Sequence, residues 1–263
     1  MITAPSRVRF DQWLHWADLT RVLAVKNFRQ KYLRSRLGVL WALLQPLAQA
    51  AVLSFVFMKI FKVHKVPHYP IYVLSGIMAW SFFSQAVVGG TTAVVDNASL
   101  VRKVSVPKLT FPISVVGGVL LVFLLQTVVL LGGAVQAGTL SPVTPALLLL
   151  AVVLEALLGM ALAILFCAFQ VFLRDIRFVV ESGLLMSFYL TPVLYDPSRL
   201  PAKYQHLLQW NPMYGVLSLL RAALLGRTVN WTSVAISAIV TMVLLIVAVP
   251  VFRHRSADFA DVV

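Results

Sequence analysis

The membrane topology of this chain can be counted from one stretch, KYLRSRLGVLWALLQP, which covers residues 31–46. A basic arm ends within it, and after Arg36 no charged residue follows until Lys59. Cations directly before a long apolar run are typical of a membrane boundary whose basic side lies in the cytoplasm. The stretch therefore predicts the first crossing and its direction, although such a flank on its own is typical of any inner-membrane protein.

The composition excludes a soluble fold. Hydrophobic residues make up 60% of the chain and charged residues only 12%, against roughly 25% charged residues in soluble domains. The net charge is +13, but the cations lie mostly at the edges of apolar segments, which predicts contact with membrane lipids and not with nucleic acid. The single cysteine, Cys167, excludes an intrachain disulfide. We expect an all-α integral membrane protein.

Two regions follow from the pattern, an N-terminal interface helix at residues 1–38 and a membrane domain at residues 39–263. The first region mixes apolar side chains, Trp13 and Trp16 among them, with eight Lys or Arg residues. Such a mixture is typical of an amphipathic helix that lies among lipid headgroups or against a protein partner on the cytoplasmic side.

Six apolar segments predict six transmembrane helices: residues 39–61, 71–95, 109–137, 145–173, 178–195 and 231–252. The fifth of these should break near Thr191 and Pro192. An even number of crossings places both termini on one side, which then carries 15 of the Lys and Arg residues, against seven on the other. This asymmetry predicts cytoplasmic termini. Small residues spaced four apart, such as Gly159 and Ala163, predict close packing between helices.

Two charged segments connect crossings on the cytoplasmic side. In DNASLVRKVSVPK, residues 96–108, Asp96 or Asn97 is suited to cap a short helix that Pro107 would stop before the next crossing. Such a helix could dock a partner, or the segment could be a solvated loop. The second segment is the tight turn RDIR at residues 174–177.

The segment between the last two crossings has unusual proportions. It is amphipathic from Ser198 to Trp210, and Asn211 and Pro212 then begin a helix that is apolar for only about a dozen residues, short of the about 20 needed to span. This second helix should dip into the membrane and return, or lie at the interface. Gly226 is a suitable C-terminal stop.

Two acids, Glu155 and Glu181, fall within predicted crossings. Carboxylates inside a membrane are costly and indicate a function such as proton coupling, or pairing with a polar neighbour. Glu181 lies one turn from a boundary, so pairing or placement near the headgroups is favoured there. Glu155 is deeper.

The sequence carries no motif for energy-converting chemistry. It has no G-x-x-x-x-G-K-[ST] phosphate loop, no serine elbow and no metal-spaced cluster of His, Cys and carboxylates. His64 and His68 are four apart, but Pro67 disfavours the helix that would align them on a metal. We expect no enzyme and no metal, and a transporter subunit that takes its energy from a partner.

Four blocks, in this order, carry a resemblance to a known family: RSRLGVLWALLQP (34–46), NASLVRKVSVPK (97–108), RDIRF (174–178) with TPVLYDPSRLP (191–201), and WNPMYGVLSLLRAALLG (210–226). Together they resemble the permease subunit of ABC-2 type polysaccharide exporters. The O-antigen exporters are most similar, and the teichoic acid exporters are similar too.

The resemblance implies a homodimer of this chain with two copies of an ATP-binding subunit, which bind the ATP and Mg, while this chain binds no cofactor. It implies movement of a lipid-linked polysaccharide across the bacterial inner membrane, as in lipopolysaccharide biosynthesis. It also implies roles for particular residues. Those for ATPase coupling are Asn97, Leu100, Arg102, Lys103, Arg174, Asp175 and Arg177, and those of a periplasmic gate of short re-entrant helices are Pro201, Trp210, Pro212 and Arg221.

Aromatic side chains could line such a pore, because their faces stack on the apolar faces of sugar rings. At about 100° per residue, three pairs share a helix face: Trp41 with Phe55, Tyr72 with Phe83, and Phe178 with Tyr189. These six are our pore-lining predictions. Aromatic residues in membrane helices also commonly face lipid, pack inside, or form the interfacial belt.

Three alternatives remain open at this point. The chain could be the permease of a teichoic acid or capsular polysaccharide exporter, or a proton-coupled secondary transporter that uses Glu155 or Glu181. The absence of an evident internal repeat speaks against the secondary transporter. A membrane-embedded glycan enzyme would need polar residues clustered on one face.

Overall fold

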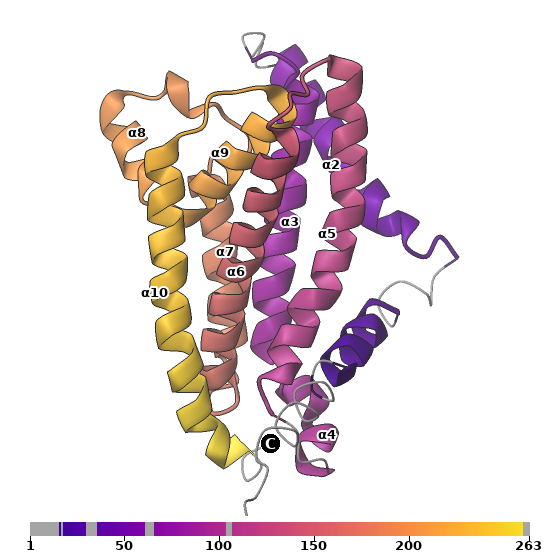
Figure 1. Cartoon of the computed structure of the whole chain (residues 1–263), viewed down its shortest axis with the longest axis vertical. Coiled ribbons are helices and arrows are strands. Elements are labelled where there is room, and N and C mark those ends of the chain that lie inside the picture. The colour runs from indigo at the N-terminus through magenta and orange to yellow at the C-terminus, as the bar shows by residue number, and fades with distance from the viewer. Residues whose placement is uncertain (1–15, 17, 30–35, 61–65, 104–106, 260–263) are drawn as a thin grey trace, which may run out of the picture.

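The computed structural model describes residues 16, 18–29, 36–60, 66–103 and 107–259. Within these ranges the chain is helical and contains no strand. Figure 1 shows the long helices side by side in one bundle. The predicted all-α membrane fold is confirmed.

Five helices among the described residues are long and apolar enough to cross a membrane. They are α2 (Leu40–Phe55), extended by a π-helical turn at Val56–Ile60, α3 (Tyr69–Thr92), α5 (Thr110–Ala137), α6 (Thr144–Gln170) and α10 (Trp231–Arg255). Their positions match five of the six predicted crossings.

The fifth predicted crossing, residues 178–195, contains a helix that ends at the break predicted near Thr191 and Pro192. Helix α7 (Ile176–Leu190) has 15 residues, or about 22 Å at the usual rise, against a hydrocarbon core of about 30 Å. It stops because Thr191 is extended, with φ −89° and ψ 137°, as the following Pro192 requires. After Leu190 the chain continues as an irregular segment as far as Asp196.

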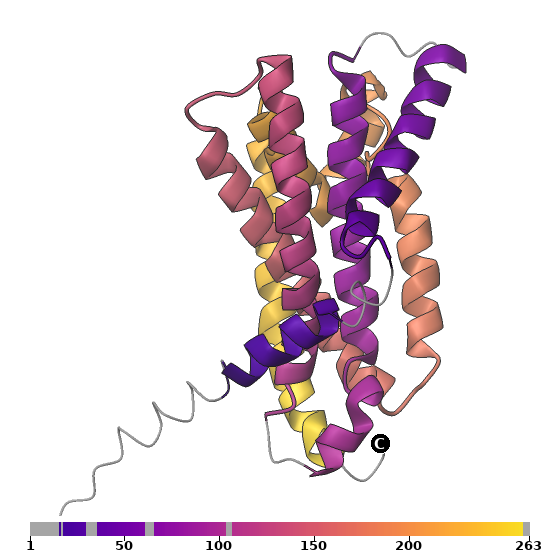
Figure 2. The same ribbon diagram turned by 90° about the vertical axis from the view of Figure 1, so that its right-hand side faces the viewer.

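The two ends of the bundle differ. Helix α4 (Ala98–Lys103), the turn at residues 171–175 and the last turns of α10 lie at one end, called the α4 end below; helix α8 (Ala202–Gln209) lies at the opposite, α8 end (Figures 1 and 2). Phe259, the last described residue, packs against Phe172 and Phe252 at the α4 end, and helical residues 18–29 lie in that half of the molecule (Figure 2).

Helix α3 forms the centre of the bundle, with most of its residues buried. It approaches α6 closely, because a Cβ added at Gly90 would meet the Ala163 Cβ at 2.3 Å, and one added at Gly159 would meet that of Ala86 at 3.3 Å. The predicted packing role of Gly159 and Ala163 is confirmed. By contrast, α2, α7 and α10 expose apolar faces.

The described part of the N-terminal region, residues 18–29, is a helix that crosses α5 obliquely (Figure 2). Leu23 and Ala24 are buried, while Lys26 and Arg29 are exposed. A Cβ at Gly118 of α5 would lie 3.0 Å from the Ala24 carbonyl oxygen. This part therefore has the predicted apolar and basic faces. The domain limit at residue 38 stays a prediction.

The short apolar helix α9 (Pro212–Leu225) begins and ends where the sequence predicts. The Asn211 Oδ1 accepts a hydrogen bond from the Met213 N–H at 3.0 Å, and Gly226 ends the helix with φ 62°. Its last carbonyls need partners, because a helix end inside a membrane has no water to bond. Hydroxyls of Thr139 and Thr144 donate to Leu224 O and Ala223 O at 2.6 and 2.9 Å. Helix α9 is thus buried in the bundle and does not lie on its surface.

Candidate functional site

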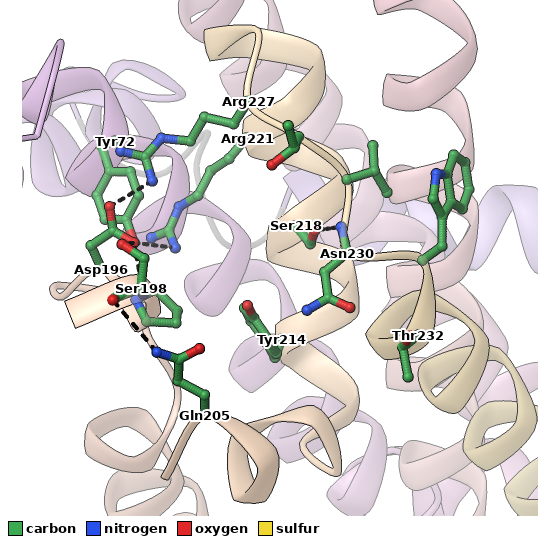
Figure 3. Close-up of a pocket in the computed structure, with 14 residues that line it drawn as sticks. Tyr72, Asp196, Ser198, Gln205, Tyr214, Ser218, Arg221, Arg227, Asn230 and Thr232 are labelled. Carbon is green, nitrogen blue, oxygen red and sulfur yellow. Dashed lines mark hydrogen bonds and ion pairs between the residues drawn. The ribbon is translucent and has the colours of Figure 1, made fainter. Parts of the chain in front are cut away.

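A polar cavity of about 680 Å³ opens at the α8 end (Figure 3). Its walls come from α3, the segment after α7, α8, α9 and the turn into α10. The lining includes Tyr72, Asp196, Ser198, Gln205, Tyr214, Ser218, Arg221, Arg227, Thr228, Asn230, Trp231 and Thr232. The volume lies within the about 300–1,000 Å³ common for small-molecule sites.

Arg221 of α9 holds one wall of this cavity together. Its Nη1 donates to the Tyr72 hydroxyl and to Pro192 O, each at 2.7 Å, and its Nη2 donates to Val193 O at 2.8 Å. Its guanidinium carbon also lies 3.5 Å from the Tyr72 ring centroid. The irregular segment that follows α7 is thereby fixed to α3.

The charge of Arg221 has no acidic partner among the described residues. The side chain is almost fully buried, all of its hydrogen-bond acceptors are neutral, and its Nε has no partner. A buried cation without an opposite charge is costly unless hydrogen bonds or a ligand compensate it.

Asp196 and Arg227 form the ion pair of the cavity. The Arg227 Nη1 donates to the Asp196 carboxylate at 2.9 Å, and that carboxylate also accepts hydrogen bonds from Ser198 N and Oγ. Burial alone would raise the pKa of Asp196, but these hydrogen bonds and the Arg227 charge outweigh burial, so the pKa lies below its ordinary value. Asp196 is therefore ionised at neutral pH.

The opposite wall carries neutral polar groups on α9 and α10. Asn230 caps α10, since its Oδ1 accepts from Ser233 N at 3.1 Å, and its backbone N–H donates to the Ser218 hydroxyl at 2.8 Å. Figure 3 shows the Asn230 side-chain nitrogen and the Tyr214 hydroxyl pointing toward the open centre. The cavity thus offers donors, acceptors and aromatic surface to a polar ligand.

A second polar cavity, of about 400 Å³, lies between α2, α3 and α5. Trp41 lines it together with Gln45, Gln49, Ser81, Ser84, Gln85 and Gln126. The Gln126 Nε2 donates to Ala42 O at 2.8 Å, which ties α5 to α2. These glutamines and serines were not predicted from the sequence. Gln45 and Gln49, four residues apart in an apolar segment, share one helix face and could have indicated a polar site there.

Comparison with known proteins decides the family. The family model described as the ABC-2 type transporter matches residues 18–225. The chain belongs to this family. The resemblance inferred from the four sequence blocks is thereby confirmed.

Relatives of this ABC-2 family member have similar lengths. An O-antigen export system permease protein RfbA of Klebsiella pneumoniae is 25% identical over 93% of this chain and 95% of that protein. The protein of the same name from Myxococcus xanthus is 28% identical, over 91% and 93%. A polysialic acid transport protein KpsM of Escherichia coli is 24% identical, over 89% and 92%.

The four residues predicted for the gate lie next to α8 or on α9 of this ABC-2 chain. Pro201 and Trp210 flank α8, Pro212 begins α9, and Arg221 lines the polar cavity. Trp210 is exposed and Arg221 is buried. Their role in a gate stays a prediction.

The six aromatic residues predicted to line a pore fall into two groups. Trp41, Phe55, Phe178 and Tyr189 are exposed on α2 and α7, while Tyr72 and Phe83 are buried in the single chain. Tyr72 lies under Arg221, and Phe83 lines an apolar cavity between α3, α6 and α7. No observation on the structure tests the pore role, which stays a prediction for all six.

The residues predicted for ATPase coupling lie at the α4 end. Asn97 ends a short 3₁₀ turn (Val95–Asn97) and donates to Ala93 O at 2.8 Å. Leu100 is half-buried and Arg102 is exposed on α4. Lys103 is the last residue of that helix, and its side chain lies outside the described part of the structure. Of the two alternatives for this segment, a short helix or a solvated loop, the structure has the helix.

The second charged turn presents Arg174, Asp175 and Arg177 to solvent. Gln170 fixes it, because its Nε2 donates to Arg174 O at 3.0 Å and its Oε1 accepts from Arg177 N at 2.7 Å. Sequence reasoning overlooked Gln170, since a lone amide at a helix end carries no distinctive pattern.

The two predicted buried acids have different surroundings. Glu181 is not buried: it is partly exposed and pairs with Arg177 at 2.7 Å, so pairing with a neighbour is the correct one of the two interpretations. Glu155 is fully buried in α6, and neither carboxyl oxygen has a hydrogen-bond partner in the described part of the chain. The spacing of His64 and His68 as a metal pair is not tested, because His64 lies outside the described residues.

Proposed function

We propose that this chain is the transmembrane subunit of an ATP-driven exporter that moves a lipid-linked polysaccharide of the O-antigen kind across the bacterial inner membrane. The substrate class is supported by the relatives, which are named for O-antigen export and polysialic acid transport and match over most of both chains. The transport mode is supported by membership in the ABC-2 family. Both termini lie in the cytoplasm in this proposal, so the α8 end faces the periplasm.

The active assembly contains two copies of this chain and two copies of an ATP-binding subunit, which binds ATP and Mg. A separate ATPase is needed because the sequence contains no phosphate loop. The α4 end offers it exposed cations at Arg102, Arg174 and Arg177. In this proposal the apolar side chains exposed along α7 contact the second copy or the surrounding lipid.

The observation that carries the transport path is the amide-rich cavity beside Trp41. Amide and hydroxyl groups at membrane depth are costly unless they meet protein, water or a polar substrate. A row of them next to an exposed indole could bind sugar hydroxyls weakly and in succession while the ring stacks on sugar faces. In a dimer this surface would form part of the pore wall.

The pore proposal is tested in cells that export the polysaccharide. Trp41→Ala and Tyr189→Ala should lower the amount of surface polysaccharide severalfold while leaving the amount of protein in the membrane unchanged. Leu149→Ala, on an equally exposed apolar position of α6, is the matched control and should change neither quantity. Parallel losses of protein and export would instead indicate a folding role and contradict the proposal.

Two other glycan classes are alternative substrates for the same machinery. KpsM of Escherichia coli is named for polysialic acid transport, so a capsular polysaccharide is an alternative substrate, as is a teichoic acid. Complementation of export-deficient strains of each kind separates these classes. Rescue of a capsule strain and not of an O-antigen strain would overturn the proposed substrate.

A proton-coupled secondary transporter is favoured by one observation, the unpaired buried carboxyl of Glu155. Glu155→Gln keeps the shape of the side chain and removes its titratable proton. ATP-driven export predicts that this variant transports at the wild-type rate. Loss of transport together with dependence on the proton gradient would support the secondary transporter.

A further inference from the structure

We propose that the polar cavity at the α8 end binds one acidic saccharide unit of the exported glycan. This inference rests on the proposed export function, because it assigns the cavity to the substrate of that transport. The unit would be a pyranose that carries a carboxylate or a phosphate. The cavity would hold it where the glycan leaves the pore.

The lining of the cavity suits a sugar and not a lipid tail. It combines amides (Gln205, Asn230), hydroxyls (Ser198, Ser218, Thr228, Thr232) and a carboxylate with the rings of Tyr214 and Trp231. Sugar hydroxyls both donate and accept hydrogen bonds, and their ring faces pack on aromatic side chains. The cavity between α3, α6 and α7 is lined mainly by apolar groups such as Trp80, Leu162 and Phe166, and it would suit a lipid tail better.

Two groups that face the cavity have hydrogen-bonding capacity to spare. Asn230 uses its Oδ1 and its backbone N–H within the protein, and its side-chain nitrogen points into the open centre (Figure 3). The Tyr214 hydroxyl points into the same space. Neither group donates to any other described residue, so both can bind a ligand without breaking a bond of the fold.

The charges of the cavity favour an acidic ligand. Two guanidinium groups, from Arg221 and Arg227, face a single carboxylate from Asp196. Arg227 is paired with Asp196, whereas Arg221 contacts only neutral acceptors. One positive charge is left over in a partly enclosed space, where its attraction for an anion is stronger than in bulk water.

The walls are rigid before any ligand enters. Asp196 is held by Arg227 and Ser198, the Gln205 Nε2 donates to Leu200 O at 2.7 Å, and Asn230 is fixed as the cap of α10. A site whose side chains are already positioned loses less conformational entropy on binding. Weak but specific binding of a single sugar unit is therefore feasible.

The test measures binding of trigalacturonic acid and of neutral maltotriose to the full chain in phosphatidylcholine nanodiscs by isothermal titration calorimetry. We expect the acidic trisaccharide to bind about tenfold more tightly at low salt, as one uncompensated charge predicts, and this preference to shrink as salt is added. Equal affinities, or no binding of the acidic trisaccharide, would overturn the proposal.

Two variants test whether binding occurs in this cavity. Trp231→Leu removes an exposed ring from its wall and should weaken the binding of trigalacturonic acid by about threefold to tenfold. Tyr204→Leu removes an exposed ring of α8 that does not line the cavity and should leave binding unchanged. Equal effects of both variants, or none, would contradict the assignment.

A lipid headgroup could also supply the anion, so the titration is repeated in nanodiscs that contain phosphatidylglycerol. Unchanged affinity supports a saccharide site, whereas loss of binding would identify the headgroup as the occupant and overturn the proposal. An export assay in cells distinguishes a failure of this inference from a failure of the proposed function. If the native complex exports its polysaccharide but the cavity binds no acidic sugar, this inference fails alone, and if no polysaccharide is exported, the proposed function itself fails.

Discussion

Arg221 connects parts of the chain that lie far apart in the sequence. Its guanidinium bonds to Tyr72, 149 residues away, and to two carbonyls of the segment after α7. The sequence marks Arg221 as a candidate functional residue, because it is the one charged residue in a short apolar helix. It could not predict the partners, because no local pattern links α9 to α3.

Replacing Arg221 should destabilise the protein strongly. Arg221→Met leaves two buried carbonyls without a donor and leaves the Tyr72 hydroxyl with only its bond to Tyr195 O, which should cost about 2–4 kcal/mol of folding stability. Thermal unfolding of the purified protein in detergent measures this loss. Tyr72→Phe, which removes only the hydroxyl, should cost about 1 kcal/mol, and equal stability of wild type and Arg221→Met would contradict the bonding scheme.

Asp196 should make stability depend on pH in the acidic range. The pKa of Asp196 is lower in the folded protein than in the unfolded chain, so its contribution is complete above about pH 4 and is lost as the pH falls through the folded-state pKa. Asp196→Asn should abolish this part of the pH dependence and lower stability at neutral pH. Identical stability profiles of variant and wild type between neutral and acidic pH would refute the role of the ion pair.

At the scale of elements, prediction succeeded where local signals decide. The bounds of α9 follow from Asn211, Pro212 and Gly226. The burial of α9 in the bundle could not be predicted in this way, because it depends on the hydroxyls of Thr139, in the turn after α5, and of Thr144, the first residue of α6. The break at the C-terminal end of α7 was predicted near Thr191 and Pro192, and it is confirmed, because the helix ends at Leu190 and Thr191 is extended.

Close contact between α9 and α10 gives a sharp test of the packing. A Cβ at Gly215 would lie 2.2 Å from the Ser237 Oγ and 2.4 Å from the Ser233 carbonyl oxygen, so Gly215→Ala should lower the melting temperature by several degrees. Gly132→Ala makes the same change in α5 where nothing lies within 4 Å. That control should be neutral or slightly stabilising, and a Gly215→Ala protein as stable as wild type would contradict the contact.

The proposed coupling role of α4 is tested by reversing its charges. Arg102→Glu combined with Lys103→Glu should prevent the ATP-binding subunit from associating, while membrane insertion continues, because the apolar segments are unchanged. Co-sedimentation with isolated membranes measures both. Arg199→Glu, an exposed cation near the α8 end, should leave association intact, and association of the double variant at the wild-type level would rule out this role.

At the scale of the whole molecule, composition and the order of apolar segments were enough to predict a helical membrane bundle. They could not predict the two polar cavities, because each gathers residues from at least three helices. The order of four sequence blocks predicted the family, which the match over residues 18–225 confirms. What moves through the assembly, and with which partner, is the proposed part.

The central claim is that this chain works as the permease of an ATP-driven exporter. Affinity purification of the chain from its native membrane, followed by identification of co-purifying proteins and an ATP hydrolysis assay, tests it most directly. The proposal predicts an ATP-binding subunit in equal amount with this chain and ATP hydrolysis in the purified complex. A chain that purifies alone and hydrolyses no ATP would contradict it and direct attention to Glu155 and the proton gradient.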